Sequence, residues 1–196
     1  MTAPAGSDAA DPDVVDLLSR AYAALGVSGD DPETADTARR VAALYPLLFR
    51  GLDPAAVPRV SLSPHAGEGL VLVKDLPFYS MCAHHLLPFF GRAAVAYLPR
   101  GRVAGLGAIA EVVDYFAARP QLQERLVEQI ADCLDEQLRP GGLIVHLQAR
   151  HMCMEMRGAQ RRALVEAVAA RGALVHGRER DECLRRLPGG AMPAAP

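Results

Sequence analysis

Two short clusters of metal-binding residue types, far apart in the sequence, constrain this chain more than any other feature. The first holds Cys82, His84 and His85, and the second holds His151 and Cys153. Zinc takes thiolate and imidazole ligands in a tetrahedral shell, and three protein ligands leave a fourth position for water. If both clusters serve one ion, the fold has to bring them together, and the open site that results is typical of hydrolytic enzymes.

The residues alone also allow a simpler interpretation. Free cysteine is among the most often buried residue types, and adjacent histidines occur by chance. Cys82 and His85 have the short separation that one metal ion bridges, whereas Cys153 has to arrive from a distant segment. Only one of the adjacent histidines can readily join that shell, which leaves the other nearby as a proton carrier. The remaining cysteines, Cys133 and Cys183, fall in helical patterns and are interpreted as structural.

Composition limits the functional classes. A chain of 196 residues with 51% hydrophobic residues forms one ordinary core with appendages. The net charge of -2 gives no general attraction to nucleic acid or to an anionic membrane. No apolar run reaches the roughly 18 residues that cross a bilayer, and the start lacks the pattern of a secretion signal. We therefore expect a cytoplasmic protein that binds neither nucleic acid nor membrane.

The ends of the chain differ from its middle. Residues 1–12 and 188–196 are rich in Ala, Pro and Gly and are predicted to be disordered tails. Helical spacing predicts two N-terminal helices within residues 13–51, and Pro46 is expected to kink or split the second one. Together with a core over 69–187, these helices are predicted to form a single domain over residues 13–187.

The core pattern predicts an α+β fold. Short apolar runs indicate strands, and three-and-four spacing indicates two helices, with Pro120 in the first turn of the second helix. A third strand is expected to carry His151 and Cys153 on one face at its far end. This order favours an antiparallel sheet with both helices packed on one face. The predicted elements are strands over 69–81, 91–98 and from 143, and helices over 106–118, 122–138 and 181–187; residues 161–173 are compatible with a further helix.

Several separated motifs, in order, resemble GTP cyclohydrolase I. They are CAHHLLPFFG at 82–91, VAYLP at 95–99, RPQLQERL at 119–126, HMC at 151–153 and RG at 157–158. The resemblance implies the T-fold, or tunnelling fold, in which two pentamers assemble face to face into a homodecamer with active sites at subunit boundaries. It also implies Zn²⁺ as cofactor and a guanine derivative as substrate.

The same resemblance assigns roles to the two clusters. Cys82, His85 and Cys153 match the zinc ligands, and His84 and His151 match the histidines that move protons around the purine ring. Water activated by zinc is then expected to attack C8 of guanine, and hydrolysis of the opened ring releases formate. In the family, the ribose subsequently rearranges to give dihydroneopterin triphosphate.

Substrate contacts also follow from the matched motifs. Glu124 matches the carboxylate that reads the guanine edge, and Gln123 matches a neighbouring pocket residue. A carboxylate suits guanine because adjacent N–H donors need a fixed pair of acceptors. On the residues alone, a solvated helix face is the favoured interpretation of this pair. Arg40 and Arg157 match two members of the family's triphosphate clamp.

Other clamp positions depart from the family. Ala43 and Ala108 replace usual lysines, Glu111 replaces a usual arginine, and Gly107 replaces a usual serine. Each lost cation removes a charge-assisted contact of about 1.5–3 kcal/mol, and Glu111 adds repulsion. These departures predict a cyclohydrolase that prefers a guanine derivative with fewer phosphates than GTP. Ala83 also replaces a usual glutamate beside the zinc ligands, which alters how those ligands are oriented.

Three alternatives remain open at the level of sequence. In an ordinary GTP cyclohydrolase I, other arginines would rebuild the clamp. A non-catalytic homologue would keep zinc for stability alone. A related nitrile reductase would need a nucleophilic cysteine and a nicotinamide cofactor, and the two metal-binding clusters argue against it. The arginines that could rebuild the clamp are Arg39, Arg92, Arg102 and Arg150.

Overall fold

The computed structural model describes residues 10–27 and 29–187, and contacts divide the chain into two units at Arg50. In the N-terminal unit, α1 spans Pro12–Ala24 and α2 spans Thr37–Leu48. Asp11 caps α1 by accepting hydrogen bonds from the first backbone N–H groups of the helix. The predicted tails fall largely outside the described residues, although Pro12 already begins α1. Both predicted helices are present, and α2 continues through Pro46 without a split.

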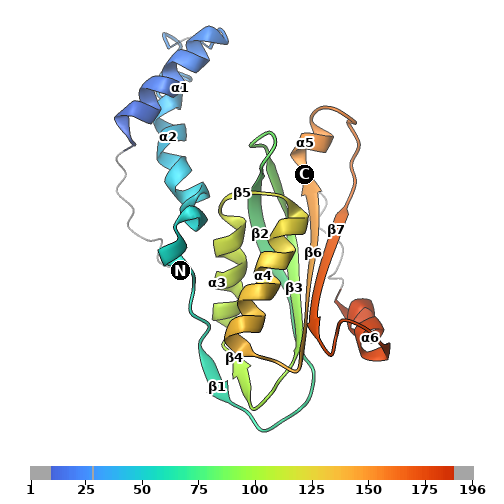
Figure 1. The fold of residues 1–196 in the computed structure, drawn as a ribbon. Coiled ribbons are helices and arrows are strands. Elements are labelled where there is room, and N and C mark those ends of the chain that lie inside the picture. Colours follow the sequence, from blue (N-terminus) through green and yellow to red (C-terminus); the bar gives the residue numbers. More distant parts are fainter. Residues whose placement is uncertain (1–9, 28, 188–196) are drawn as a thin grey trace. The chain divides into compact units, whose positions relative to one another are not determined.

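The second unit is built on a five-stranded sheet with the order β5-β2-β3-β6-β7 (Figure 1). Its four long strands pair antiparallel, and β5 adds a short parallel pairing at the end of β2. A separate two-stranded pairing joins β1 and β4, and two short 3-10 helices precede β1. The strands are β1 Leu62–Pro64, β2 Val71–Cys82, β3 Pro88–Leu98, β4 Arg102–Ala104, β5 Pro120–Gln121, β6 Gly142–His151 and β7 Val165–Gly172, and the 3-10 helices span Arg50–Leu52 and Pro54–Ala56.

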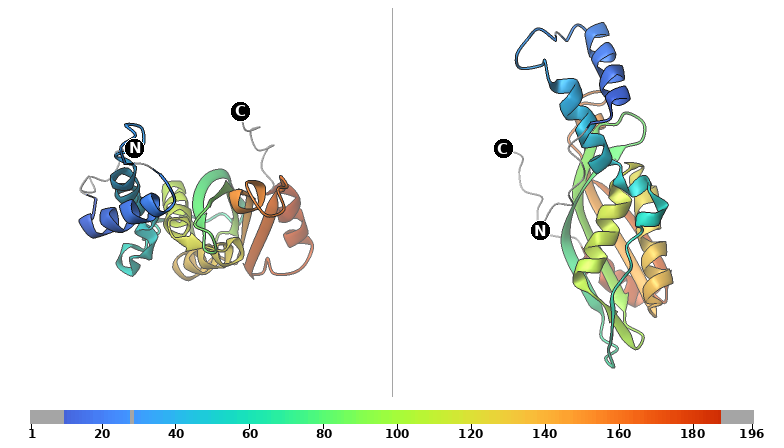
Figure 2. Two further views of the ribbon diagram at one scale, coloured as in Figure 1. Left: turned by 90° about the horizontal axis from the view of Figure 1, so that it is seen from above. Right: turned by 90° about the vertical axis from the view of Figure 1, so that its left-hand side faces the viewer.

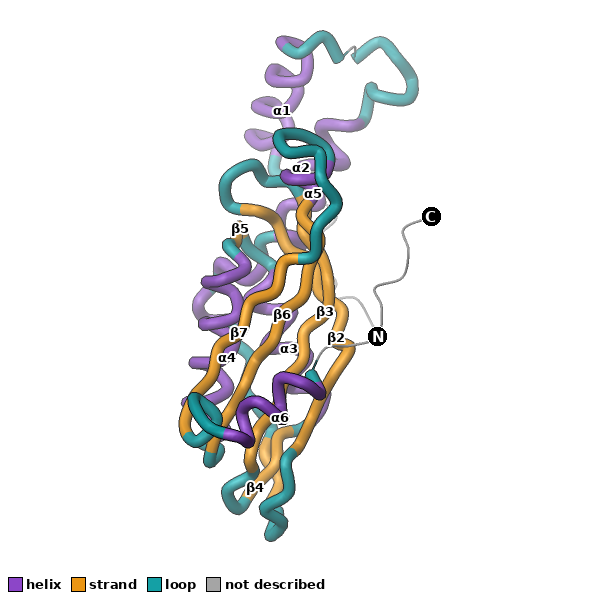
Figure 3. The backbone as a smooth tube through the Cα atoms, turned by 90° about the vertical axis from the view of Figure 1, so that its right-hand side faces the viewer, coloured by secondary structure: helices purple, strands orange, loops and turns teal. Residues whose placement is uncertain are grey.

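Helices α3 (Leu106–Ala117) and α4 (Gln123–Leu138) cover one face of this sheet (Figure 2). Side chains of β3 alternate between the two faces of the sheet, and each face packs in its own cluster of buried residues. Ala93 and Val95 point into the main core with the two helices, whereas Ala94 and Ala96 belong to a smaller cluster on the other face. That smaller cluster is covered by α6, which spans Arg178–Arg186 (Figure 3). The α+β class and the antiparallel sheet with two helices on one face are confirmed.

Three local predictions were wrong. Pro120 lies in β5 rather than in a helix, because an edge position tolerates a residue without an N–H group, and α4 begins only at Gln123. Cys153 lies on α5, a single helical turn over Met152–Glu155, and not on the strand that ends at His151. Residues 165–172 form a strand, because pairing with β6 outweighs the helical propensity of an Ala- and Arg-rich segment.

Within residues 10–27 and 29–187, no helix is both long and apolar enough to cross a bilayer.

At Gly91, the backbone of β6 leaves no room for a side chain. A Cβ atom at this position would lie 1.8 Å from the carbonyl oxygen of Gln148 and 2.7 Å from the Cα atom of Ala149. Both atoms belong to the backbone of β6, so relief requires one strand to move. We expect Gly91→Ala to lower the free energy of unfolding by about 3 kcal/mol or more, measured by urea denaturation. Gly69→Ala is the matched control, because nothing lies within 4 Å of its added Cβ atom.

Candidate metal centre

The sheet brings the two sequence clusters to one end. β2 and β6 both run toward this end, and β3 starts there between them. Met81 lies opposite Pro88, and Phe89 lies opposite His151. Cys82, the last residue of β2, is therefore one strand away from the end of β6.

A tight turn folds His85 back toward Cys82. The N–H group of Leu86 donates to the carbonyl oxygen of Cys82 at 2.8 Å, and the N–H group of Cys82 donates to Leu87 at 2.8 Å. Leu86 has a φ of 50°, which a residue with a branched side chain rarely adopts. This turn sets the Cys82 Sγ atom 4.0 Å from Nδ1 of His85.

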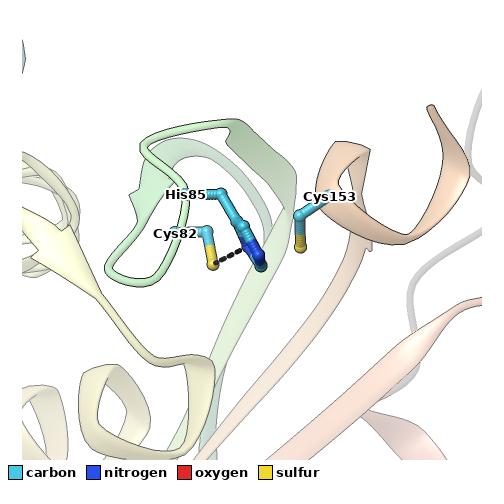
Figure 4. A group of neighbouring side chains, drawn as sticks. All are labelled: Cys82, His85 and Cys153. Atoms are coloured by element: carbon cyan, nitrogen blue, oxygen red, sulfur yellow. Dashed lines mark hydrogen bonds between the residues drawn. The ribbon is translucent and has the colours of Figure 1, made fainter. Parts of the chain in front are cut away.

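Helix α5 supplies the third potential ligand. Because the chain turns into a helix directly after His151, Cys153 points back toward the turn that carries Cys82 and His85 (Figure 4). One ligand atom from each of the three residues lies within 4.8 Å of the others. Within the described part of the chain, this is the one group of three or more metal-binding side chains so arranged.

The chemistry and spacing of the three donors fit zinc. Zn–S bonds of about 2.3 Å and Zn–N bonds of about 2.0 Å place tetrahedral ligands about 3.5–3.8 Å apart. The observed spacing needs only a small contraction to reach that geometry. Burial raises the pKa of the Cys153 thiol, and the neighbouring Cys82 raises it further. A bound divalent cation would offset this rise in pKa, because coordination favours the deprotonated thiolates.

His151 lies beside this group and is held on two sides. Its ring stacks on Phe89 with a centroid distance of 4.7 Å and an interplanar angle of 2°. Its Nε2 atom lies 2.7 Å from Oε1 of Gln123. Burial lowers the pKa of His151, and the charge of Glu124 opposes this shift. His84 is exposed, and its ring lies edge-on to that of His85 at 6.1 Å.

The other predicted site residues are distributed unevenly. Gln123 and Glu124 open α4 and lie on the His151 side of the site. Arg157 is exposed just after α5, where its charge acts on Cys153. Arg40 belongs to the N-terminal unit, where it pairs with Asp36 at 3.3 Å. Sequence reasoning missed the Phe89 stack and the bond from His151 to Gln123, since both depend on strand and helix registers that local patterns do not reveal.

Two of the positions that differ from the family's triphosphate clamp, Ala108 and Glu111, lie far from the metal-binding residues of the same chain. β3 runs away from the site, and α3 begins only after β4. The first turn of α3, which contains Ala108, therefore lies at the opposite end of the sheet (Figure 1), and Glu111 follows one turn later.

Comparison with known proteins gives a consistent match. The family model of GTP cyclohydrolase I matches residues 16–187. A protein named GTP cyclohydrolase 1 from Carboxydothermus hydrogenoformans is 53% identical over 144 residues, which cover 70% of this chain and 74% of the relative. The protein of that name from Bacillus cytotoxicus is 49% identical over 158 residues, which cover 76% and 82%.

One solved structure is more distantly similar. The apo form of the archaeosine synthase QueF-Like aligns with a TM-score of 0.47 and 22% sequence identity, covering 55% of this chain and 97% of that chain.

Proposed function

This chain belongs to the GTP cyclohydrolase I family, and from that premise we propose that it opens the imidazole ring of a guanine nucleotide at C8 and releases formate. The convergence of Cys82, His85 and Cys153 beside His151 is the observation that carries this proposal. A zinc ion held by these three residues would act as the Lewis acid that activates water. The overall step consumes two waters, one to open the ring and one to hydrolyse the resulting formamide.

The protein side chains have three tasks in this reaction. Glu124 offers two acceptor oxygens to the adjacent N–H groups of guanine and so orients the base. His151 is held at the edge of the site and exchanges a proton with a nitrogen of the imidazole ring. His84, which is exposed next to the ligand His85, is the second proton carrier. With these roles, the side chains would orient the base and move the protons that hydrolysis of its imidazole ring requires.

We further propose that the substrate carries fewer phosphates than GTP. Three positions that usually carry a cation hold Ala43, Ala108 and Glu111 instead. Three of the arginines that could rebuild the clamp are already paired with carboxylates, which leaves Arg102, on β4 at the end of the sheet where α3 begins. The ion pairs are Arg39 with Asp36, Arg92 with Asp75, and Arg150 with Glu155.

Some phosphate binding is still expected at this site. Arg157, Arg161 and Arg162 are exposed on the segment that follows α5. The N–H group of Arg161 donates to the carbonyl oxygen of Met154 at 3.4 Å, so this segment folds back beside Cys153. Three guanidinium groups favour an anionic substrate over guanosine or free guanine.

A second candidate is the ordinary reaction on GTP, which gives dihydroneopterin triphosphate. The observation that favours it is the name of the relatives, GTP cyclohydrolase 1, at 48–53% identity.

Formate release from GTP, GDP, GMP and guanosine separates the two candidates. We expect kcat/KM for GMP or GDP to exceed that for GTP. In the double variant Ala108→Lys with Glu111→Arg, kcat/KM for GTP is expected to rise at least tenfold, since each restored contact contributes about 1.5–3 kcal/mol. A wild-type preference for GTP would establish the ordinary enzyme. Zinc binding without formate release from any guanine compound would favour the non-catalytic homologue.

We also propose that the active form is a homo-oligomer. Apolar side chains are exposed around the metal-binding end of the sheet: Tyr79 is 73% exposed, Leu86 45% and Met156 64%. The clamp positions on α3 lie at the other end of the sheet, so they can approach a phosphate only if another copy presents them. Sedimentation of the active protein tests this, and an active monomer would contradict it.

A further inference from the structure

Gln123 is unusually well enclosed for the first residue of a helix. Its side chain lies where α4 meets β6 and β7, and the residue is 1% exposed. The amide nitrogen lies 3.2 Å from the carbonyl oxygen of Leu147 and 3.0 Å from that of Val165. Carbonyl oxygens only accept hydrogen bonds, so the NH₂ group has to face both of them. The amide orientation of Gln123 is therefore determined by its surroundings.

This orientation determines where His151 carries its hydrogen. Because the amide nitrogen donates to Leu147 and Val165, it is the amide oxygen of Gln123 that faces Nε2 of His151, at 2.7 Å. An amide oxygen cannot donate, so Nε2 has to be the donor. In the neutral imidazole, the second nitrogen, Nδ1, then holds a free electron pair.

The ring of His151 is also fixed in its plane. Phe89 is fully buried and stacks almost parallel to it, with an interplanar angle of 2°. Stacking fixes the plane of the ring, and the bond to Gln123 fixes its rotation within that plane. A ring flip would break the hydrogen bond and leave the oxygen of Gln123 buried without a donor, which disfavours the flipped ring.

We infer that Gln123 is a positioning residue, which presents Nδ1 of His151 to the substrate and does not itself contact guanine. This inference rests on the proposed function, in which His151 exchanges a proton with the purine ring. A proton taken up at Nδ1 leaves the Nε2–H group bonded to Gln123, and its release restores the starting state. The amide therefore supports both forms of the histidine without rearranging.

Two substitutions of Gln123 separate positioning from stability. Gln123→Met removes every hydrogen bond of the amide, whereas Gln123→Glu keeps an acceptor for His151 and loses the paired donors to Leu147 and Val165. We expect a lower melting temperature in both variants. We expect kcat to fall at least tenfold in Gln123→Met but less than about threefold in Gln123→Glu, with KM nearly unchanged in both, because general acid–base catalysis contributes about 10²–10⁴-fold.

The control is Gln129→Met, on the same helix. Its side chain accepts a hydrogen bond from Gln121 at 2.7 Å, so kcat should not change. A raised KM with unchanged kcat in Gln123→Met would show that Gln123 contacts substrate instead. Equal losses of kcat in both Gln123 variants, in proportion to melting temperature, would show a purely structural role. Either result overturns the inference.

A second measurement does not depend on activity or on the folding of the Gln123 variants. Solid-state NMR of wild-type protein labelled with ¹⁵N-histidine reports which ring nitrogen carries hydrogen, and His151→Asn identifies the signal of His151. We expect the Nε2–H form, and an Nδ1–H form would refute the inference. If the protein released no formate yet showed the Nε2–H form, the proposed function would fail while the positioning of His151 by Gln123 stood.

Discussion

Replacing Cys153 with alanine is expected to remove bound zinc and to abolish ring opening. The chain offers three ligands, Cys82, His85 and Cys153, and two ligands do not hold zinc in a protein site. Even the loss of a group that only orients a ligand costs about 10–100-fold in metal affinity, so loss of a ligand should cost more. Turnover should fall on the order of 10⁴-fold or more, because neutral water is a poor nucleophile.

Metal content and formate release, measured on the same preparation, check this expectation. Cys183→Ala is the matched control, since that buried thiol lies on α6 and, among the described residues, belongs to no group of three metal-binding side chains. It should retain zinc and turnover and lose only about 1 kcal/mol of stability. Full zinc occupancy in Cys153→Ala would mean that the assigned ligand set is incorrect.

The family resemblance implied that the two clusters meet, but it did not give their geometry. Residue types and their order pointed to the family, which the family match over residues 16–187 confirms. The sequence also suggested that His151 and Cys153 share one strand face. The structure instead ends β6 at His151 and places Cys153 on a helical turn. A strand and a single helical turn differ by few local signals, so spacing alone could not decide between them.

Tertiary pairing explains the other differences. The segment that forms β7 is rich in Ala and Arg, and its strand conformation depends on the ladder with β6. Gln123 looks like any polar residue at a helix start, yet it is buried because Leu147 and Val165 bring carbonyl groups to it. Such contacts join segments far apart in sequence, and only the assembled sheet defines them.

Glu124→Gln is expected to lower kcat/KM for guanine nucleotides by about 10²–10⁴-fold. A carboxylate accepts two N–H bonds from guanine, each worth about 1.5–3 kcal/mol when the acceptor is charged. The glutamine amide offers one acceptor oxygen, and its NH₂ group opposes the second guanine donor. Glu124 is exposed in the first turn of α4, so its substitution should not disturb folding or zinc content.

A comparison of GMP with IMP as substrates tests this role of Glu124 more directly than the loss of kcat/KM alone. Hypoxanthine lacks the 2-amino group of guanine, so wild-type protein should prefer GMP over IMP by about 10–100-fold, and Glu124→Gln should narrow this ratio toward one. The control is Glu128→Gln, one turn further along α4, where the carboxylate pairs with Arg171 at 2.6 Å. It should leave the ratio unchanged. If Glu124→Gln changed neither this ratio nor kcat/KM for GMP, another group would read the guanine edge, because removing one of two acceptors cannot leave recognition of both N–H groups intact.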